Sequence, residues 1–221
     1  MALTFYHGHG SPYAWRVFLA LEHLRVPYEL KLLSFSAKDT RKPEFLAVNP
    51  RGKVPTIVDD GVAMWESSAI LEYLDETYGI EGPARLYAGT ATERARIRRL
   101  IRESEEQLEL KGIDIVIDEY LGKGDAAPDA EKASAARAKI AEELAYLERE
   151  LGKGPYFGVE APNALDFVIY PMVGYMKRVT FRKPDAALTA LLRPPMVAWA
   201  ERIEKLPYFD KTFPAHWKTT P

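Results

Sequence analysis

A serine stands directly before a proline at the start of a predicted helix, within the segment YHGHGSPYAWRV. Serine is a favoured helix cap and proline a favoured first helical residue, so Ser11 and Pro12 mark where the helix begins. The backbone N–H groups of a helix start are unpaired and carry partial positive charge, so they attract anions. Taken alone, these residues leave two interpretations of Ser11: it only caps the helix, or it also holds a ligand.

The same segment carries two histidines, which can exchange protons near neutral pH. His7 and His9 are therefore candidate acid–base groups, although a loop histidine is more often simply solvated. The glycines on either side of His9 would let the backbone bend tightly before the helix. We interpret Trp15 and Arg16, inside the helix, as structural residues.

Two further polar sites follow along the chain. Lys53 can meet a carboxylate, unless it is an ordinary solvated lysine. Pro55 either opens an edge strand or shapes a ligand-binding loop. Ser67 is predicted to cap the next helix, whose start would attract an anion, and Glu66 lies beside it. The alternative for these two residues is an ordinary helix cap next to an exposed glutamate.

Short β-type and helical runs alternate in the first part of the chain. Alternating apolar residues mark the strands, and apolar residues three and four positions apart mark the helices. The predicted strands are 3–6, 28–33, 55–58 and 62–65, and the predicted helices are 12–24, 43–48 and 67–79. This order predicts a mixed sheet with helices packed on it, which is an α/β fold.

The strands disappear after about residue 90, and long helical runs follow. The predicted helices are 92–110, 129–151, 163–178 and 195–205. Asn163 and Asp166 stand three residues apart before an apolar run, which predicts a capping box at the start of a buried helix. We therefore expect a first domain over 1–80, a linker over 81–91 and an all-helical domain over 92–221.

The composition bounds what the protein can be. The chain has 221 residues, no cysteine and a net charge of −2. Without cysteine there can be no disulfide, thiolate metal ligand or protein thiol nucleophile, and the balanced charge does not favour nucleic acid or an anionic membrane. The first ten residues lack the pattern of a signal peptide, so we expect a cytoplasmic protein.

The arginines and glutamates of helix 92–110 are interpreted as a solvated face or, alternatively, as a dimer contact with cross-paired charges.

Four stretches together resemble the glutathione S-transferase family, in a serine-type, theta/zeta-like bacterial form. They are SPYAWRV at 11–17, NPRGKVPTI at 49–57, WESSAILEYL at 65–74 and PNALDFVIYP at 162–171. A short motif such as KVP would be a weak signal alone, but the order and spacing of all four cover essentially the whole chain. The resemblance implies a thioredoxin-like α/β domain that binds glutathione, followed by an all-α domain that shapes the second substrate's pocket. It also implies a homodimer and a cis Val54–Pro55 bond.

The resemblance also implies roles for the candidate residues. In serine-type transferases the hydroxyl at the position of Ser11 hydrogen-bonds the glutathione thiolate, which makes Ser11 the implied catalytic residue. Tyr6 stands where tyrosine-type members place their catalytic phenol and is the second candidate. A cis Pro55 would turn the N–H and C=O of Val54 toward glutathione, which would pair there like an extra strand, and Lys53 would meet a carboxylate.

The γ-glutamyl end of glutathione carries a carboxylate and an ammonium group. The resemblance implies that Ser67 and the start of its helix bind the carboxylate, and that Glu66 binds the ammonium. Ser104 or Glu105 of a second copy of the chain is expected to reach the same group.

The interaction free energies expected at Ser11 are large enough to lower the pKa of a thiol. A thiol with a pKa of about 8.5 is only a few per cent ionised at pH 7, and lowering that pKa by about 2 units needs roughly 2.7 kcal/mol. A helix start supplies up to about 1–2 kcal/mol, and a hydrogen bond to a charged group supplies about 1.5–3 kcal/mol. The two together suffice, whereas neither clearly does so alone.

We therefore expect a glutathione transferase of the detoxifying kind. Glutathione would be its co-substrate and a small hydrophobic electrophile its second substrate, with no metal. The electrophile pocket is expected at Tyr13, Tyr175 and residues 111–120. One alternative is a glutathione-dependent isomerase of the maleylacetoacetate type, although Pro12 and Tyr13 replace the second serine and the cysteine of that class. The other is a non-catalytic, glutathione-binding regulatory protein.

Overall fold

The computed structural model describes residues 3–79, 82, 84–124, 126–158 and 160–217, which form two compact units. Of the described residues, those up to Ala88 and those from Leu206 to Trp217 belong to the first unit, and those from Gly89 to Lys205 belong to the second. The first is a mixed α/β unit and the second is helical, which confirms the predicted fold class. Residues 81 and 83 of the predicted linker, and the ends of the predicted domains at 1–2, 80 and 218–221, lie outside the described residues.

The first unit is built on a four-stranded mixed sheet. Its strands are β1 (Leu3–Gly8), β2 (Tyr28–Leu33), β3 (Thr56–Asp59) and β4 (Val62–Trp65). The strand order is β2-β1-β3-β4; β2 runs parallel to β1, whereas β3 is antiparallel to both β1 and β4. Asp60 and Gly61 join β3 to β4 with positive φ angles of 47° and 79°, as the predicted hairpin requires. β1 is therefore an inner strand, and its end leads to Ser11.

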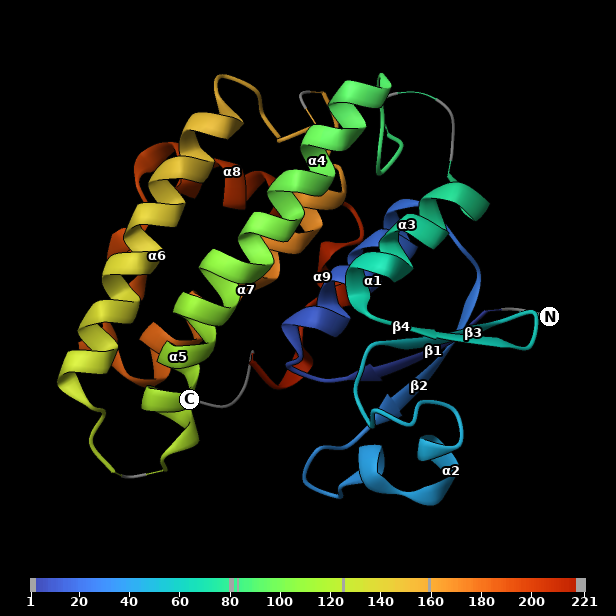
Figure 1. Cartoon of the computed structure of the whole chain (residues 1–221), viewed down its shortest axis with the longest axis horizontal. Helices are drawn as coiled ribbons and strands as arrows, with labels where there is room; N and C mark the ends of the chain where they lie inside the picture. Colours follow the sequence, from blue (N-terminus) through green and yellow to red (C-terminus); the bar gives the residue numbers. More distant parts are fainter. Residues whose placement is uncertain (1–2, 80–81, 83, 125, 159, 218–221) are drawn as a thin grey trace. The chain divides into compact units, whose positions relative to one another are not determined.

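Helices cover both faces of this sheet (Figure 1). They are α1 (Pro12–His23), α2 (Pro43–Leu46) and α3 (Ser67–Tyr78). Phe5 of β1 packs on Phe18 of α1, with ring centroids 5.6 Å apart, while Tyr6 lies 5.4 Å from Phe45 of α2. Since successive side chains of a strand point to opposite faces, α1 and α2 lie on opposite sides of the sheet. α3 packs against α1 and shares its side.

Residues 206–217 also belong to the first unit, which differs from the predicted boundaries. The helix α9 (Phe209–Thr212) packs along α1 (Figure 1). Trp15 of α1 donates a hydrogen bond from Nε1 to Oγ1 of Thr212 at 3.1 Å, and its ring contacts Phe209, Phe213 and Trp217. Aromatic burial against α1 therefore holds residues 206–217 to the sheet unit, whereas the sequence placed them in the helical domain.

The second unit is built from α-helices. They are α4 (Ala91–Glu103), α5 (Asp114–Ile117), α6 (Ala130–Leu151), α7 (Ala164–Arg182) and α8 (Pro194–Glu204). Wider π-helical turns at Ser104–Ile113 and Asp118–Gly122 continue the path of α4 and α5, so the first long helical stretch runs beyond the predicted end at residue 110. None of the described helices is both long enough and apolar enough to cross a bilayer.

Buried side chains fix the start of α7, the most apolar helix of the second unit. The side-chain oxygen of Asn163 accepts hydrogen bonds from the backbone N–H groups of Leu165 (2.9 Å) and Asp166 (3.3 Å). The Asp166 carboxylate accepts three more, from the N–H of Asn163 (2.8 Å), the N–H of Phe157 (3.1 Å) and Nε1 of Trp199 (2.7 Å). These bonds confirm the predicted capping box and add an anchor to α8.

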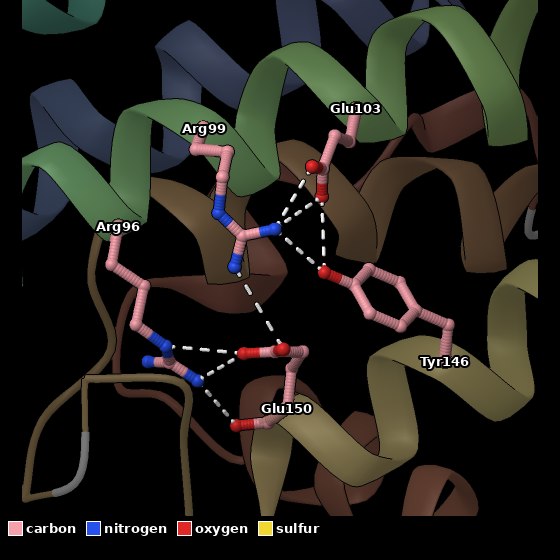
Figure 2. Close-up of polar contacts among 5 residues, drawn as sticks. All are labelled: Arg96, Arg99, Glu103, Tyr146 and Glu150. Atoms are coloured by element: carbon pink, nitrogen blue, oxygen red, sulfur yellow. Dashed lines mark hydrogen bonds and ion pairs between the residues drawn. The ribbon is translucent and has the colours of Figure 1, made fainter.

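Exposed ion pairs join α4 to α6 (Figure 2). Arg96 donates to a carboxylate oxygen of Glu150 at 2.6 Å, and Arg99 donates to Glu103 and to the hydroxyl of Tyr146, both at 2.8 Å. These arginines therefore find their acidic partners within one chain. Because exposed pairs contribute only about 0–1 kcal/mol each, the cluster should add little to the stability of the second unit.

The Asp166 hydrogen bonds lead to a stability prediction. Asp166→Ala should lower the free energy of unfolding by about 3–5 kcal/mol, because it leaves buried N–H donors without an acceptor. Urea denaturation at pH 7 measures this, above the pKa of about 6 to which burial raises Asp166. Asp185→Ala, at an exposed aspartate of the same unit, is the control and should change little. A loss below 1 kcal/mol for Asp166→Ala would contradict the assignment.

Candidate functional site

A tight turn places Ser11 at the start of α1. The backbone N–H of Ser11 donates to the carbonyl of Gly8 at 3.0 Å, and Gly10 has a φ of +83°, a conformation that glycine adopts without strain. The Ser11 side-chain oxygen accepts a hydrogen bond from the N–H of Ala14 at 3.2 Å, so Ser11 does cap the helix. A capping hydroxyl still has its own O–H to donate, and the cap therefore leaves a ligand role open.

The loop over residues 49–56 is held by an asparagine that the sequence analysis did not single out. Asn49 is fully buried, and its side-chain Nδ2 donates to the carbonyl of Lys53 and to Oγ1 of Thr56, both at 2.9 Å. Its Oδ1 accepts from the N–H of Arg51, also at 2.9 Å. Asn49 opens the NPRGKVPTI stretch, and a polar residue at the start of a loop is a suitable internal brace.

Val54 and Pro55 lie at the end of this braced loop, and the peptide bond between them is cis, as the resemblance implied. Pro55 is buried, and Lys53 is exposed beside it. A Cβ atom on Gly8 would lie 3.1 Å from Cγ2 of Val54 and 2.5 Å from Cζ of Phe35. The loop therefore packs directly on the turn that carries Ser11, and a side chain at residue 8 would require Phe35 and Val54 to shift.

The cap of α3 differs from the prediction, although the helix begins at the predicted residue. The helix begins at Ser67, and Glu66 occupies the cap position without making a side-chain cap bond, so the prediction that Ser67 caps this helix is wrong. Glu66 has a φ of +68°, a conformation that costs a non-glycine residue about 1–3 kcal/mol and is often found at functional sites. Its side chain is exposed, whereas Ser67 is buried.

Arg16 connects α1 to the start of α3. Its guanidinium is fully buried and donates from Nη1 to Oγ of Ser67 at 3.3 Å, and it lies 5.1 Å from the ring centroid of Tyr13. The interpretation of Arg16 as structural is therefore incomplete, because it brings positive charge to a helix start. An arginine among the apolar residues of a buried helix is the signal that could have identified this role.

The histidines differ in their surroundings. His7 is 1% exposed and packs on Phe5 and Phe18, and burial lowers its pKa to about 3. Its imidazole is therefore neutral at pH 7. His9 is partly exposed; burial also lowers its pKa, and its ring lies 5.9 Å from that of His216. Within the described part of the chain, no three His, Asp or Glu side chains gather as metal ligands would.

The remaining candidates lie in the second unit. Ser104 is 3% exposed and sits where α4 passes into its π-helical continuation. Glu105 is half-buried and pairs with Arg102 at 2.7 Å. Burial raises the pKa of Tyr175, which lies on α7. The roles of these residues toward a second chain or a second substrate stay predictions.

The architecture is a mixed α/β unit, which carries Ser11 and the cis-proline loop, followed in the chain by a helical unit. Two family models match this sequence: "Glutathione S-transferase, N-terminal domain" over residues 10–77, and "Glutathione S-transferase, C-terminal domain" over residues 88–202. The chain belongs to the glutathione S-transferase family.

Relatives with known names agree with this assignment. The chain is 44% identical to glutathione S-transferase 1 of Schizosaccharomyces pombe over 78 residues, and this match spans only 34% of each protein. It is 26% identical to glutathione S-transferase A of Pleuronectes platessa over 226 aligned positions, which cover 99% of this chain and 94% of the relative.

Solved structures resemble the whole chain. A glutathione S-transferase from the Antarctic clam Laternula elliptica has a TM-score of 0.81 and 27% identity, with coverage of 100% of this chain and 95% of that one. Poplar glutathione transferase F1 has a TM-score of 0.80 at 23% identity, with 96% of each chain covered, and supports the fold alone.

The buried His7 leads to a prediction on pH. Because its folded-state pKa of about 3 lies below the usual value near 6.5, the folded state resists protonation, and the stability present above pH 6.5 is lost as the pH falls. The contribution of His7 should drop by about 2 kcal/mol between pH 7 and pH 5. Urea denaturation of wild type and His7→Phe should give parallel stabilities above pH 7 and a shallower decline for the variant below it. Identical declines would contradict the prediction.

Proposed function

We propose that the protein is a glutathione transferase that acidifies the glutathione thiol and directs the thiolate at a small hydrophobic electrophile. The observation that carries the proposal is the Ser11 hydroxyl, which lies at the start of α1 in a glycine turn, with the Val54 loop packed on that turn. The thiol proton passes to solvent, and the sulfur forms a bond to an electrophilic carbon. A leaving group departs, or the attacked double bond takes up a proton.

The rate advantage comes from ionisation of the thiol before attack. At α1 the thiolate would meet the unpaired N–H groups of a helix start and the O–H of Ser11. Both favour the charged form and so lower the thiol pKa. Glutathione supplies the sulfur nucleophile, since the chain has no cysteine of its own.

The other proposed contacts hold the rest of glutathione. The exposed Lys53 and the partly exposed Val54, which precede the buried Pro55, suit a peptide with a terminal carboxylate. At the other end, the start of α3 offers N–H groups to the γ-glutamyl carboxylate, and Arg16 supports Ser67 there. The exposed Glu66 then suits the ammonium group of the same residue.

We also propose a serine-type, theta/zeta-like subclass, because SPYAWRV places a serine rather than a tyrosine at the helix start. A maleylacetoacetate-type isomerase and a non-catalytic regulatory protein remain the competing functions that assays must separate. A panel of electrophiles with glutathione, including maleylacetone and a chloronitrobenzene, tests all three. Turnover of the aromatic halide but not of maleylacetone supports the transferase, and the reverse supports the isomerase.

The role of Ser11 is tested by the ionisation of bound glutathione. Ser11→Ala should raise the pKa of the bound thiol by roughly 1–2 units and lower the rate at pH 7 by about one to two orders of magnitude, because it removes a charged hydrogen bond of about 1.5–3 kcal/mol. Thiolate absorbance measured against pH reports the pKa directly. Glutathione affinity should fall less than the rate.

Tyr6→Phe is the matched control, since it removes the competing hydroxyl of the same segment. It should leave the titration of the bound thiol nearly fixed. If Tyr6→Phe moves the titration and Ser11→Ala does not, Ser11 is mainly a helix cap. Absence of any rise in melting temperature at millimolar glutathione would remove both catalytic functions, because a ligand of the folded state must stabilise it.

We further propose a cytoplasmic homodimer in which Ser104 or Glu105 of a second copy approaches the γ-glutamyl group. Glu105 is the better placed of the two, because Ser104 is buried within its own unit. Light scattering at micromolar concentration should give about 50 kDa, twice the 25.0 kDa of the chain, and a stable interface should bury more than about 1,000 Å². A mass of one chain would contradict the dimer.

A further inference from the structure

The last residues of the first unit form a strap along α1, which we define as residues 206–217. In the middle of the strap, Lys211 pairs with Glu22 at 2.7 Å, near the C-terminal end of α1. Further along, Thr212 accepts the hydrogen bond of Trp15. α1 has 12 residues and is therefore about 18 Å long, so the strap follows most of its length toward Ser11.

The strap ends on the turn that carries Ser11. Its last described turn is Ala215–Trp217. A Cβ atom on Gly10 would lie 3.3 Å from Cε1 and Nε2 of His216 and 3.4 Å from Nε1 of Trp217. The His216 ring also lies 5.9 Å from the ring of His9. The strap therefore contacts both central residues of the turn, His9 and Gly10, which stay partly exposed, through the exposed His216.

A glycine turn needs such a contact if it is to hold a hydroxyl in place. Glycine is the residue with the most backbone freedom, so a turn with glycine at residues 8 and 10 resists distortion weakly by itself. A displacement of about 1 Å at a reacting group can cost a large part of the rate. Packing of His216 and Trp217 on the turn restricts this freedom at the residue directly before Ser11.

We propose that His216 is a positioning residue for Ser11, and that its ring acts by packing on Gly10 and His9 rather than by exchanging a proton. Trp217 also packs on Gly10, through its indole Nε1. The inference rests on the proposed role of Ser11 toward the glutathione thiolate. It adds the strap to the parts of the fold that influence the pKa of the bound thiol.

His216→Ala tests the proposal through the bound thiol. The variant should raise the pKa of bound glutathione by about 0.5–1 unit and lower kcat at pH 7 roughly three- to tenfold, with KM for glutathione within about twofold of wild type. Lys211→Ala is the control, because it removes an exposed contact of the same strap at the far end of α1. It should leave both the titration and kcat unchanged. An unchanged titration in His216→Ala would overturn the proposal.

Two further variants separate packing from proton transfer. His216→Phe keeps a flat ring but carries no proton, so it should restore most of kcat and the wild-type titration. If His216→Phe is as impaired as His216→Ala, the imidazole acts chemically and the positioning role is wrong. If both variants lose the wild-type far-UV circular dichroism, the strap is needed for folding and the specific role on Ser11 is likewise wrong.

The double variant Ser11→Ala/His216→Ala shows whether the ring acts through Ser11. The bound thiol of the double variant should titrate as in Ser11→Ala alone, because residues that act through one group are not additive. A further rise in the pKa would mean that His216 acts without Ser11. If Ser11→Ala by itself leaves the titration unchanged, the proposed function fails first. If Ser11→Ala shifts the titration and His216→Ala does not, only the present inference fails.

Discussion

The hydrogen bond from the Ser11 backbone N–H to the Gly8 carbonyl closes the turn that takes the chain from β1 into α1. Gly10 permits this turn through its positive φ, and Gly8 leaves room for the side chain of Val54. A side chain at either glycine would strain the turn or push the cis-proline loop away. The end of an inner strand, the start of a helix and the cis-proline loop therefore meet at this turn, which carries the Ser11 hydroxyl.

Buried polar side chains hold the other parts of the molecule in register. Asn49 braces its loop from inside, Arg16 reaches the start of α3, and Asp166 ties α7 to α8. Each satisfies donors or acceptors that would be costly to bury alone. The ion pairs of α4 and α6 (Figure 2) are exposed, so solvent screens them and they contribute less. The positions of the elements within each unit therefore depend more on interior hydrogen bonds than on surface ion pairs.

Local patterns predicted much of the fold. The strands, the main helices, the β3–β4 hairpin and the capping box at Asn163 follow from apolar spacing and from side chains that bond within a few residues. The helix α3 begins at Ser67 as predicted, but its cap was misplaced by one residue, because Glu66 occupies the cap position with a positive φ that differs from the usual cap geometry. The strap was assigned to the helical domain because nothing in its local pattern indicates that it packs on α1.

The sequence by itself determined that Ser11 stands at a helix start, that the sheet unit precedes a helical unit, and which family motifs are present. These features depend on neighbours within a few positions, where residue type alone fixes the geometry. Only the tertiary structure decided that Arg16 meets Ser67, that Trp15 meets Thr212, and that His216 contacts Gly10. Such contacts join residues from about 50 to about 200 positions apart. The spacing of apolar residues does not indicate them, because they depend on how whole elements pack.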